Sequence, residues 1–148
     1  MFNILSDGPS DAALNLALAH GAGGAMDSKF MQYFATHLGA SGYRITRFEF
    51  PYMAERRVTG KKRPPDHLPK LLETWMSLIA YLGPENLVIG GKSMGGRIAS
   101  IVADEARVKG LLCLGYPFHA PGRPPGSNRL EQLKMLQTPT LICQGTRD

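Results

Sequence analysis

Long apolar runs are what this sequence lacks most clearly. None of its 148 residues belongs to an uninterrupted hydrophobic stretch near the roughly 20 residues that a membrane-spanning helix needs. The N-terminus does not show a basic segment followed by an apolar one, which is the pattern of a secretion signal. These absences argue against membrane-spanning and secreted classes of protein, and we expect a cytoplasmic protein that does not bind membranes.

Cysteine is nearly absent as well. The two cysteines, Cys113 and Cys143, fall in separate apolar runs, where a free thiol behaves as a small hydrophobe. Their spacing does not match a metal site, and disulfides are rare in intracellular proteins. We therefore expect both cysteines to be inert core residues, and the sequence implies no metal and no cofactor.

The remaining composition is that of an ordinary globular protein, with 43% hydrophobic and 20% charged residues. Its length suits one domain, predicted over residues 1–148. The net charge of +5 comes from one segment, because residues 44–70 hold eight Lys and Arg against three acidic residues. This segment is either a solvated loop or a surface that attracts acidic partners. It has no interleaved aromatic side chains of the kind that bind single-stranded nucleic acid, so nucleic-acid binding is not predicted.

Apolar runs and helical periodicities alternate along the chain, which indicates an α/β fold. We expect a mostly parallel sheet with helices on both faces, in three αβα layers. The predicted strands are residues 2–5, 13–19, 43–50, 86–90, 110–115 and 139–143. Two predicted helices are capped at their N-termini, one by Asp27 or Ser28 and one by Asp66. The other two begin after residue 93 and at Ser127 or Asn128. Residues 52–65 and 116–126 are predicted loops.

The most informative stretch is residues 89–96, Ile-Gly-Gly-Lys-Ser-Met-Gly-Gly, which contains Gly-x-Ser-x-Gly around Ser93. An apolar strand precedes it and an amphipathic helix follows, which is the setting of a nucleophile elbow. In such a turn the serine takes a strained backbone conformation that exposes its hydroxyl. An incidental glycine turn is the alternative interpretation.

An activated serine also needs donors that stabilise the oxyanion of the tetrahedral intermediate. The amide of Met94, at the start of the helix after Ser93, is one candidate. The second is predicted in the glycine loop over residues 20–24, where Gly21, Ala22 and Gly23 follow a strand. A flexible glycine turn without a catalytic role is the alternative.

The spacing of the glycines excludes two nucleotide-binding motifs. A phosphate-binding loop would need a glycine five residues before Gly91, but Asn86 occupies that position. A dinucleotide-binding loop that began at Gly21 would need a third glycine where Met26 stands.

Six ordered blocks of sequence together resemble the α/β-hydrolase family that contains bacterial dienelactone-hydrolase-like proteins, a testis-expressed protein and a scaffold subunit of a histone acetyltransferase complex. These blocks are residues 20–23, 47–53, 64–65, 91–97, 115–119 and 144–148. The resemblance implies a serine hydrolase that acts on an ester or related acyl bond of a small molecule. It implies Ser93 as nucleophile, the amides of Met94 and Ala22 as oxyanion donors, and Asp148 as the catalytic acid. His119, on a loop at the same edge of the sheet, is expected to line the substrate site.

Such hydrolases place the serine, the acid and then a histidine along the chain, but no histidine follows Asp148. The general base is therefore missing from its expected place. We expect the chain to be a truncated form of a longer hydrolase, with impaired activity as written. We also expect that its last strand, Pro139–Cys143, leaves an uncovered edge that favours self-association. The alternative hypothesis is a non-catalytic interaction or scaffold module that binds acidic partners through residues 56–63.

Overall fold

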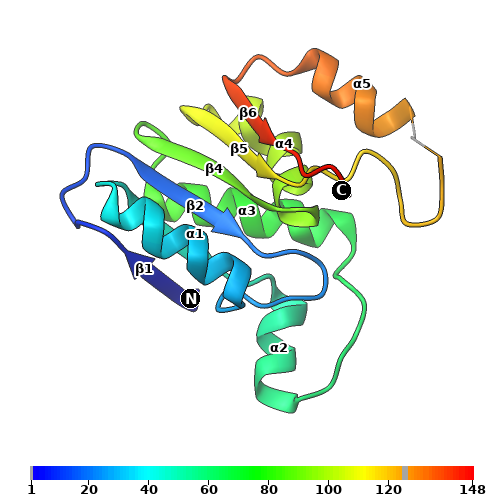
Figure 1. The fold of residues 1–148 in the computed structure, drawn as a ribbon, viewed down its shortest axis with the longest axis horizontal. Coiled ribbons are helices and arrows are strands. Elements are labelled where there is room, and N and C mark those ends of the chain that lie inside the picture. The colour runs from blue at the N-terminus through cyan, green and yellow to red at the C-terminus, as the bar shows by residue number, and fades with distance from the viewer. Residues whose placement is uncertain (1, 125–126) are drawn as a thin grey trace.

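The computed structural model describes residues 2–124 and 127–148, which form one sheet with flanking helices (Figure 1). The strands are β1 (Ile4–Asp7), β2 (Asn15–Ala19), β3 (Arg44–Phe48), β4 (Leu87–Lys92), β5 (Gly110–Leu114) and β6 (Thr140–Cys143). The helices are α1 (Lys29–Ala40), α2 (Pro51–Thr59), α3 (Leu68–Leu82), α4 (Met94–Ala106) and α5 (Ser127–Met135). The predicted loop over residues 116–126 is described as far as residue 124.

The strand order in the sheet is β1-β3-β2-β4-β5-β6. β1 is antiparallel to β3, and every other pair of neighbouring strands is parallel. The prediction of a mostly parallel sheet is therefore confirmed. The register places Ala19 of β2 beside Phe48 of β3 and Gly91 of β4. The carboxyl ends of the three central strands thus meet at one edge, where ligands of parallel sheets bind.

Helices cover both faces of this sheet, and the alternation of side chains along β2 shows how. Leu16 and Leu18 pack with Met31 and Ala35 of α1 on one face. Ala17 and Ala19 point to the other face, into a larger core that includes Trp75 of α3 and Ile98 of α4. Because successive residues of a strand face opposite sides, a continuously apolar strand is expected to be buried on both faces. Trp75 is a core residue, as predicted.

The segment after β3 differs from the prediction, because residues 51–59 form helix α2 rather than part of a loop. Pro51 lies in the first turn of α2, where a missing N–H removes no hydrogen bond, and Gly60 ends it in a left-handed conformation with φ 72°. The prediction that Asp66 caps α3 is wrong. The N-cap is His67, and Asp66 instead accepts a hydrogen bond of 2.9 Å from the amide of Tyr52 in α2.

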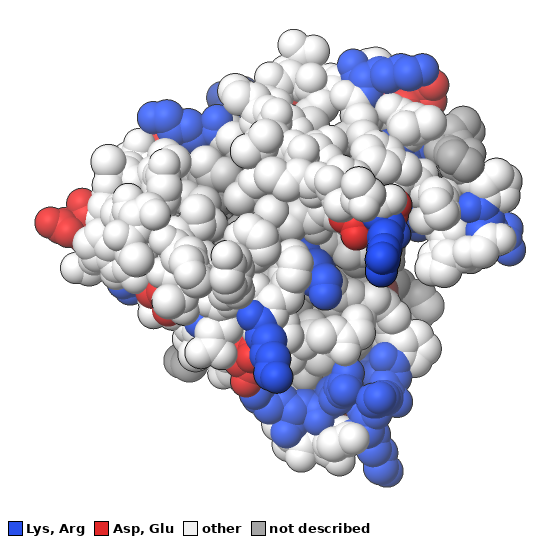
Figure 2. Space-filling model, in the orientation of Figure 1, with Lys and Arg blue, Asp and Glu red and all other residues white. Residues whose placement is uncertain are grey.

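Figure 2 shows Lys and Arg side chains gathered at the lower end of the molecule, where Figure 1 places α2 and the chain that follows it. Several of these cations have partners within the chain. Arg57 pairs with Asp27 and Glu49, and Arg63 pairs with Glu55 and Asp66. Much of the positive charge of residues 44–70 therefore holds this part of the fold together.

The other end of the sheet is less covered. β6 is an edge strand in the described part of the chain, and the side chain of its Leu141 is 60% exposed. Cys113 in β5 is buried, but Cys143 in β6 is exposed, so the prediction of a buried core position is wrong for Cys143. The physical reason is its place at an edge, since a strand there lacks a neighbour to cover it. No helix in the described ranges is long and apolar enough to cross a membrane.

Candidate active site

Ser93 lies between the end of β4 and the start of α4, in the predicted strand-turn-helix setting. Its backbone has φ 50° and ψ −116°, a conformation that residues with a side chain rarely adopt. Its amide donates a hydrogen bond of 2.9 Å to the carbonyl of Leu114 at the end of β5. The surrounding strands thus hold the serine in a strained turn at the carboxyl edge of the sheet.

Close packing against β2 explains two glycines of the Gly-x-Ser-x-Gly motif. A Cβ at Gly91, where φ is 151°, would collide with the backbone of Ala19. A Cβ at Gly95 would come within 2.5 Å of the carbonyl oxygen of His20. Real Cβ atoms do not tolerate such contacts with backbone, so larger residues would push the turn away from β2. The motif therefore serves a tight strand-turn-helix junction.

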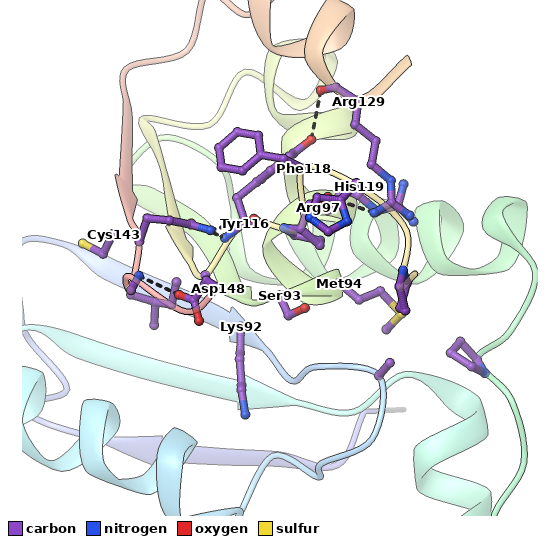
Figure 3. A pocket seen from close by; sticks show the side chains of 18 of the residues that line it. Lys92, Ser93, Met94, Arg97, Tyr116, Phe118, His119, Arg129, Cys143 and Asp148 are labelled. Carbon is purple, nitrogen blue, oxygen red and sulfur yellow. Dashed lines mark hydrogen bonds between the residues drawn. The ribbon is translucent and has the colours of Figure 1, made fainter. Parts of the chain in front are cut away.

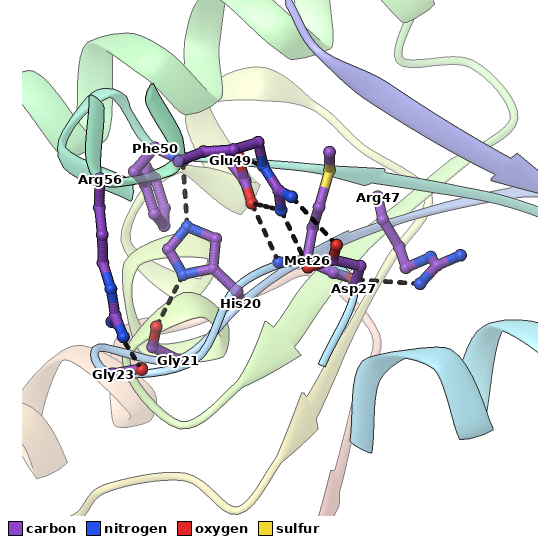
Figure 4. A network of polar contacts seen from close by, with 10 residues as sticks. His20, Gly21, Gly23, Met26, Asp27, Arg47, Glu49, Phe50 and Arg56 are labelled. Carbon is purple, nitrogen blue, oxygen red and sulfur yellow. Dashed lines mark hydrogen bonds and ion pairs between the residues drawn. The ribbon is translucent and has the colours of Figure 1, made fainter. Parts of the chain in front are cut away.

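The glycine loop that follows β2 is held through its carbonyl groups (Figure 4). His20 Nδ1 donates to the carbonyl of Gly21 at 2.7 Å, and Arg56 donates to that of Gly23 at 3.2 Å. The hydroxyl of Tyr52 donates to the carbonyl of Ala22 at 2.8 Å. In a trans peptide the N–H points away from the preceding C=O, and the described residues have no cis peptide bonds. The amides of Ala22 and Gly23 therefore point away from the side chains that hold the loop.

His20 is buried and fully engaged in this arrangement. Its Nε2 accepts a hydrogen bond of 3.1 Å from the amide of Phe50, while Nδ1 donates to Gly21. The imidazole ring also contacts Phe50 and Tyr52 edge-on. Burial lowers the pKa of His20, so the neutral ring is the stable form. With both nitrogens occupied, His20 has a structural role and is not placed to act as a base.

Tyr52 supports this loop, and the sequence analysis did not predict that role. Its phenol is buried, and burial raises its pKa to about 12, so it remains a hydrogen-bond donor. The signal in the sequence was weak, because Tyr52 follows Pro51 at the start of the segment interpreted as a loop. Only the helical geometry of α2 turns this side chain toward residues 21–22.

A second network holds the far end of the loop, near the start of α1. Arg57 donates to Asp27 at 2.9 and 3.0 Å and also to the carboxylate of Glu49, which is buried. Hydrogen bonds from Arg57 lower the pKa of Asp27. Arg47 donates to the carbonyl of Met26 at 2.9 Å. Side chains of α2 therefore hold residues 21–23, and side chains of β3 and α2 together hold Met26 and Asp27.

A pocket of about 970 Å³ opens at the carboxyl edge of the sheet (Figure 3). Five residues predicted for the site line it: Ala22, Ser93, Met94, His119 and Asp148. The other two predicted residues, Gly21 and Gly23, belong to the supporting loop and do not line the pocket. The structure thus brings together segments that lie up to 126 positions apart in the sequence, from Ala22 to Asp148.

Asp148 lies beyond β6, beside the end of β5. Its Oδ2 accepts a hydrogen bond of 2.6 Å from the amide of Gly145, and the carboxylate lies against Gly115. Gln144 anchors this turn to the chain just after β5, because its side chain accepts from the amide of Tyr116 at 2.9 Å and donates to the carbonyl of Tyr116 at 3.1 Å. Asp148 itself is exposed.

Among the residues that the structure describes, no histidine forms a hydrogen bond with Ser93. His37 is bonded to the carbonyl of Tyr33 on the exposed side of α1, and His67 is the exposed N-cap of α3. His119 lines the pocket, but its Nδ1 lies 3.2 Å from the carbonyl of Ala120. The described ranges also contain no cluster of three or more His, Cys, Asp or Glu residues able to hold a metal.

Comparison with known proteins agrees with this architecture. Residues 12–148 match the family described as the alpha/beta hydrolase domain. Because the match covers most of the chain, the protein belongs to this family. The predicted α/β-hydrolase fold is thereby confirmed.

Solved structures show the same fold. Dienelactone hydrolase from Anabaena variabilis matches 99% of this chain and 68% of its own, with a TM-score of 0.78 and 20% identity. Est1E from Butyrivibrio proteoclasticus matches 99% of this chain and 74% of its own, with a TM-score of 0.72 and 16% identity. An α/β serine hydrolase without a lid, from Xanthomonas campestris, matches 97% of this chain and 77% of its own, with a TM-score of 0.63 and 17% identity. At such identities the likeness establishes the fold, and the chemistry has to be argued from the site.

Proposed function

We propose that this protein is a serine hydrolase that cleaves an ester or related acyl bond of a small molecule, with Ser93 as the nucleophile. The observation that carries the proposal is the strained backbone of Ser93, with φ 50° and ψ −116°, at the edge of a pocket of about 970 Å³. Strain of this kind persists only where the surrounding structure enforces it, and it is concentrated at functional sites. The hydrolases among the structural neighbours support the same class of reaction.

Two backbone amides are proposed to stabilise the oxyanion. The amide of Met94 is in the first turn of α4, where N–H groups lack helical partners and the helix dipole favours negative charge. The amide of Ala22 points away from the side chains that hold the carbonyls of residues 21 and 22. Both residues line the pocket with Ser93. Donors fixed before the reaction are worth more than donors that must reorganise during it.

Asp148 is proposed as the acid that would orient a catalytic base, and His119 as a residue that contacts the substrate. A serine hydroxyl is a poor nucleophile until a base accepts its proton. None of the described histidines is bonded to Ser93, so we propose that residues 1–148 hydrolyse esters slowly. A small base in solution is then expected to replace part of the missing function.

The proposal is tested by labelling with a fluorophosphonate probe, which reacts with activated serines, and by hydrolysis of p-nitrophenyl butyrate. We expect labelling of the native protein and its loss in Ser93→Ala. We also expect imidazole to increase the part of the hydrolysis that depends on Ser93. The matched control is Ser77→Ala, because Ser77 is an exposed serine on α3, away from the pocket.

Labelling that survives in Ser93→Ala would show that another residue reacts with the probe. A complete lack of labelling, with and without imidazole and across neutral to alkaline pH, would favour the alternative of a non-catalytic interaction module. Mass spectrometry of the labelled protein identifies the modified residue directly. Thermal unfolding of each variant shows whether the fold has been retained.

A further inference from the structure

Two arginines lie in the same pocket as Ser93. Arg97 belongs to the first turns of α4, and its amide donates a hydrogen bond of 3.0 Å to the carbonyl of Ser93, so it lies one helical turn from the proposed nucleophile. Arg129 belongs to α5, and both side chains line the pocket. Figure 3 shows Arg97, His119 and Arg129 on the same side of the pocket.

Neither arginine forms an ion pair within residues 2–124 and 127–148. Arg129 donates one hydrogen bond of 2.8 Å, to the carbonyl of Pro117, which fixes its position. The half-buried side chain of Arg97 donates no hydrogen bond to the residues whose side chains are described, 2–124 and 129–148. Burial and the charge of Arg129 both lower the pKa of Arg97. Two cations held close together without a counterion are costly unless a ligand supplies the opposite charge.

The acidic residues of the pocket have other partners. Asp66 accepts from the amide of Tyr52 at 2.9 Å and from Arg63 at 3.1 Å. Asp148 accepts from the amide of Gly145 at 2.6 Å. The third cation, Lys92, is 4.6 Å from the ring centroid of Phe30, in a cation-π contact. Neither carboxylate forms an ion pair with Arg97 or Arg129, so the described pocket lining gives the two arginines no direct counterion.

Much of the remaining lining is apolar and includes Phe30, Phe34, Leu71 and Phe118. A pocket of about 970 Å³ with such walls has room for a drug-sized molecule. The guanidinium group is a flat fork of donors that matches carboxylate and phosphate oxygens. The pocket thus suits a ligand with an apolar body and one oxyanion group.

We propose that Arg97 and Arg129 form an anion subsite that selects acyl substrates carrying a carboxylate or phosphate group next to an apolar portion. This inference rests on the proposed hydrolase function and names its substrate class. The two arginines bind the anionic group, and the apolar walls receive the rest of the substrate beside Ser93.

The test compares three ligands that share a benzyl group, namely phenylacetate, benzylphosphonate and the neutral phenylacetamide. Binding is measured by calorimetry or by NMR titration at low salt. We expect at least one anion to bind about tenfold more tightly than the amide, because hydrogen bonds between charged groups are the strong ones. This preference should shrink as salt is raised. The ratio of the two anions shows which oxyanion the subsite prefers.

Variants then assign the preference to the arginines. In Arg97→Gln and in Arg129→Gln we expect the preference for the anion to fall to about twofold or less, and in Arg97→Lys we expect part of it to remain. Arg123→Gln is the matched control, because Arg123 is exposed and does not line the pocket. Equal binding of all three ligands, or an unchanged preference in Arg97→Gln, would overturn the subsite.

Fluorophosphonate labelling of Ser93 in the same variants separates the two proposals. Retained labelling of Ser93 without any preference for anions overturns the proposed anion subsite, while the proposed hydrolase function stands. Selective anion binding without labelling supports the subsite and overturns the hydrolase. Circular dichroism and thermal unfolding identify a variant that has lost its fold. If Arg97→Gln has lost it, Arg97→Lys and Arg129→Gln carry the test, and if Arg129→Gln has lost it, the two Arg97 variants do.

Discussion

Two glycine-containing loops border the pocket, and the protein holds them very differently. The loop over residues 20–24 follows β2, in the middle of the sheet, and its carbonyls accept hydrogen bonds from three side chains, that of His20 in the loop itself and those of Tyr52 and Arg56 in α2. The turn over residues 144–148 follows the edge strand β6, and every one of its residues is exposed. It is anchored chiefly by Gln144 and by the contact of Asp148 with Gly145.

The difference teaches that glycine content alone does not decide how firmly a loop is held. A loop that follows a central strand is surrounded by elements that can supply hydrogen bonds, whereas a loop after an edge strand has neighbours on one side only. The proposed nucleophile and oxyanion donors thus belong to the firmly held side of the site. The proposed acid belongs to the side with the fewest contacts.

The strongest test of this contrast adds a methyl group to the firmly held side of the site, at Gly91, and another to the turn over residues 144–148, at Gly145. Gly91→Ala directs a Cβ into the backbone of Ala19, and we expect it to cost about 3 kcal/mol in the free energy of unfolding. Gly145→Ala places a Cβ 3.0 Å from the exposed carboxylate of Asp148, which can move aside, so a cost under about 1 kcal/mol is expected. Urea unfolding of both variants measures the difference, and equal costs would remove the distinction.

The strain at Ser93 should appear as a gain in stability when it is released. We expect Ser93→Gly to raise the free energy of unfolding by about 1 to 2 kcal/mol, since glycine adopts this backbone conformation without strain. Arg107→Gly is the comparison, because Arg107 also has a positive φ, of 55°, at the end of α4. We expect a smaller gain there, and a gain at Ser93 no larger than at Arg107 would mean that the elbow stores no special strain.

The support of the firmly held loop should depend on pH through His20. Burial lowers the pKa of this histidine in the folded state, so protons bind preferentially to the unfolded state. Its contribution to stability is complete above the unfolded pKa of about 6.5 and declines as the pH falls toward the lower folded pKa. The slope for one group is at most about 1.4 kcal/mol per pH unit.

The variant His20→Gln provides the reference, because glutamine can accept the hydrogen bond from Phe50 without titrating. Urea unfolding between pH 7.5 and 5.5 should show the native protein losing stability relative to this variant. Parallel pH profiles of the two proteins would contradict the assignment of a neutral, buried His20.

The smallest effect is expected on the edge strand. Leu141→Ser changes a side chain that is 60% exposed, so we expect the free energy of unfolding to change by less than about 0.5 kcal/mol. Gel filtration of the same variant tests whether β6 mediates self-association, as the sequence suggests. A loss of more than 1 kcal/mol would show that β6 is as firmly packed as the central strands.

Most elements could be predicted because their residues carry local signals. Ser28 accepts a hydrogen bond from the amide of Met31 at the start of α1, as its place before an apolar period suggested. Helix α2 was missed because it has only nine residues and begins at Pro51, a residue type that also ends strands. The hydrogen bond from Tyr52 to Asp66 was missed for a related reason, since Tyr52 lies on α2.

The candidate site likewise contains some residues that could be predicted from the sequence and others that could not. Ser93 and Met94 were predictable because the motif and both flanking elements are contiguous in the chain. The hold of Tyr52 on Ala22 and the place of Arg129 in the pocket connect residues that are 30 or more positions apart. No local pattern indicates such contacts, because they depend on how α2 and α5 pack against the sheet.

The sequence by itself determined the alternation of strands and helices, the elbow at Ser93 and the glycine loop at residues 20–24, because backbone preferences and apolar periodicity act over short distances. Only the tertiary structure decided which loop is firmly held, which cysteine is exposed, and which charges remain without a partner in the pocket. These properties depend on the order of strands in the sheet and on long-range packing. A one-dimensional pattern does not contain that information.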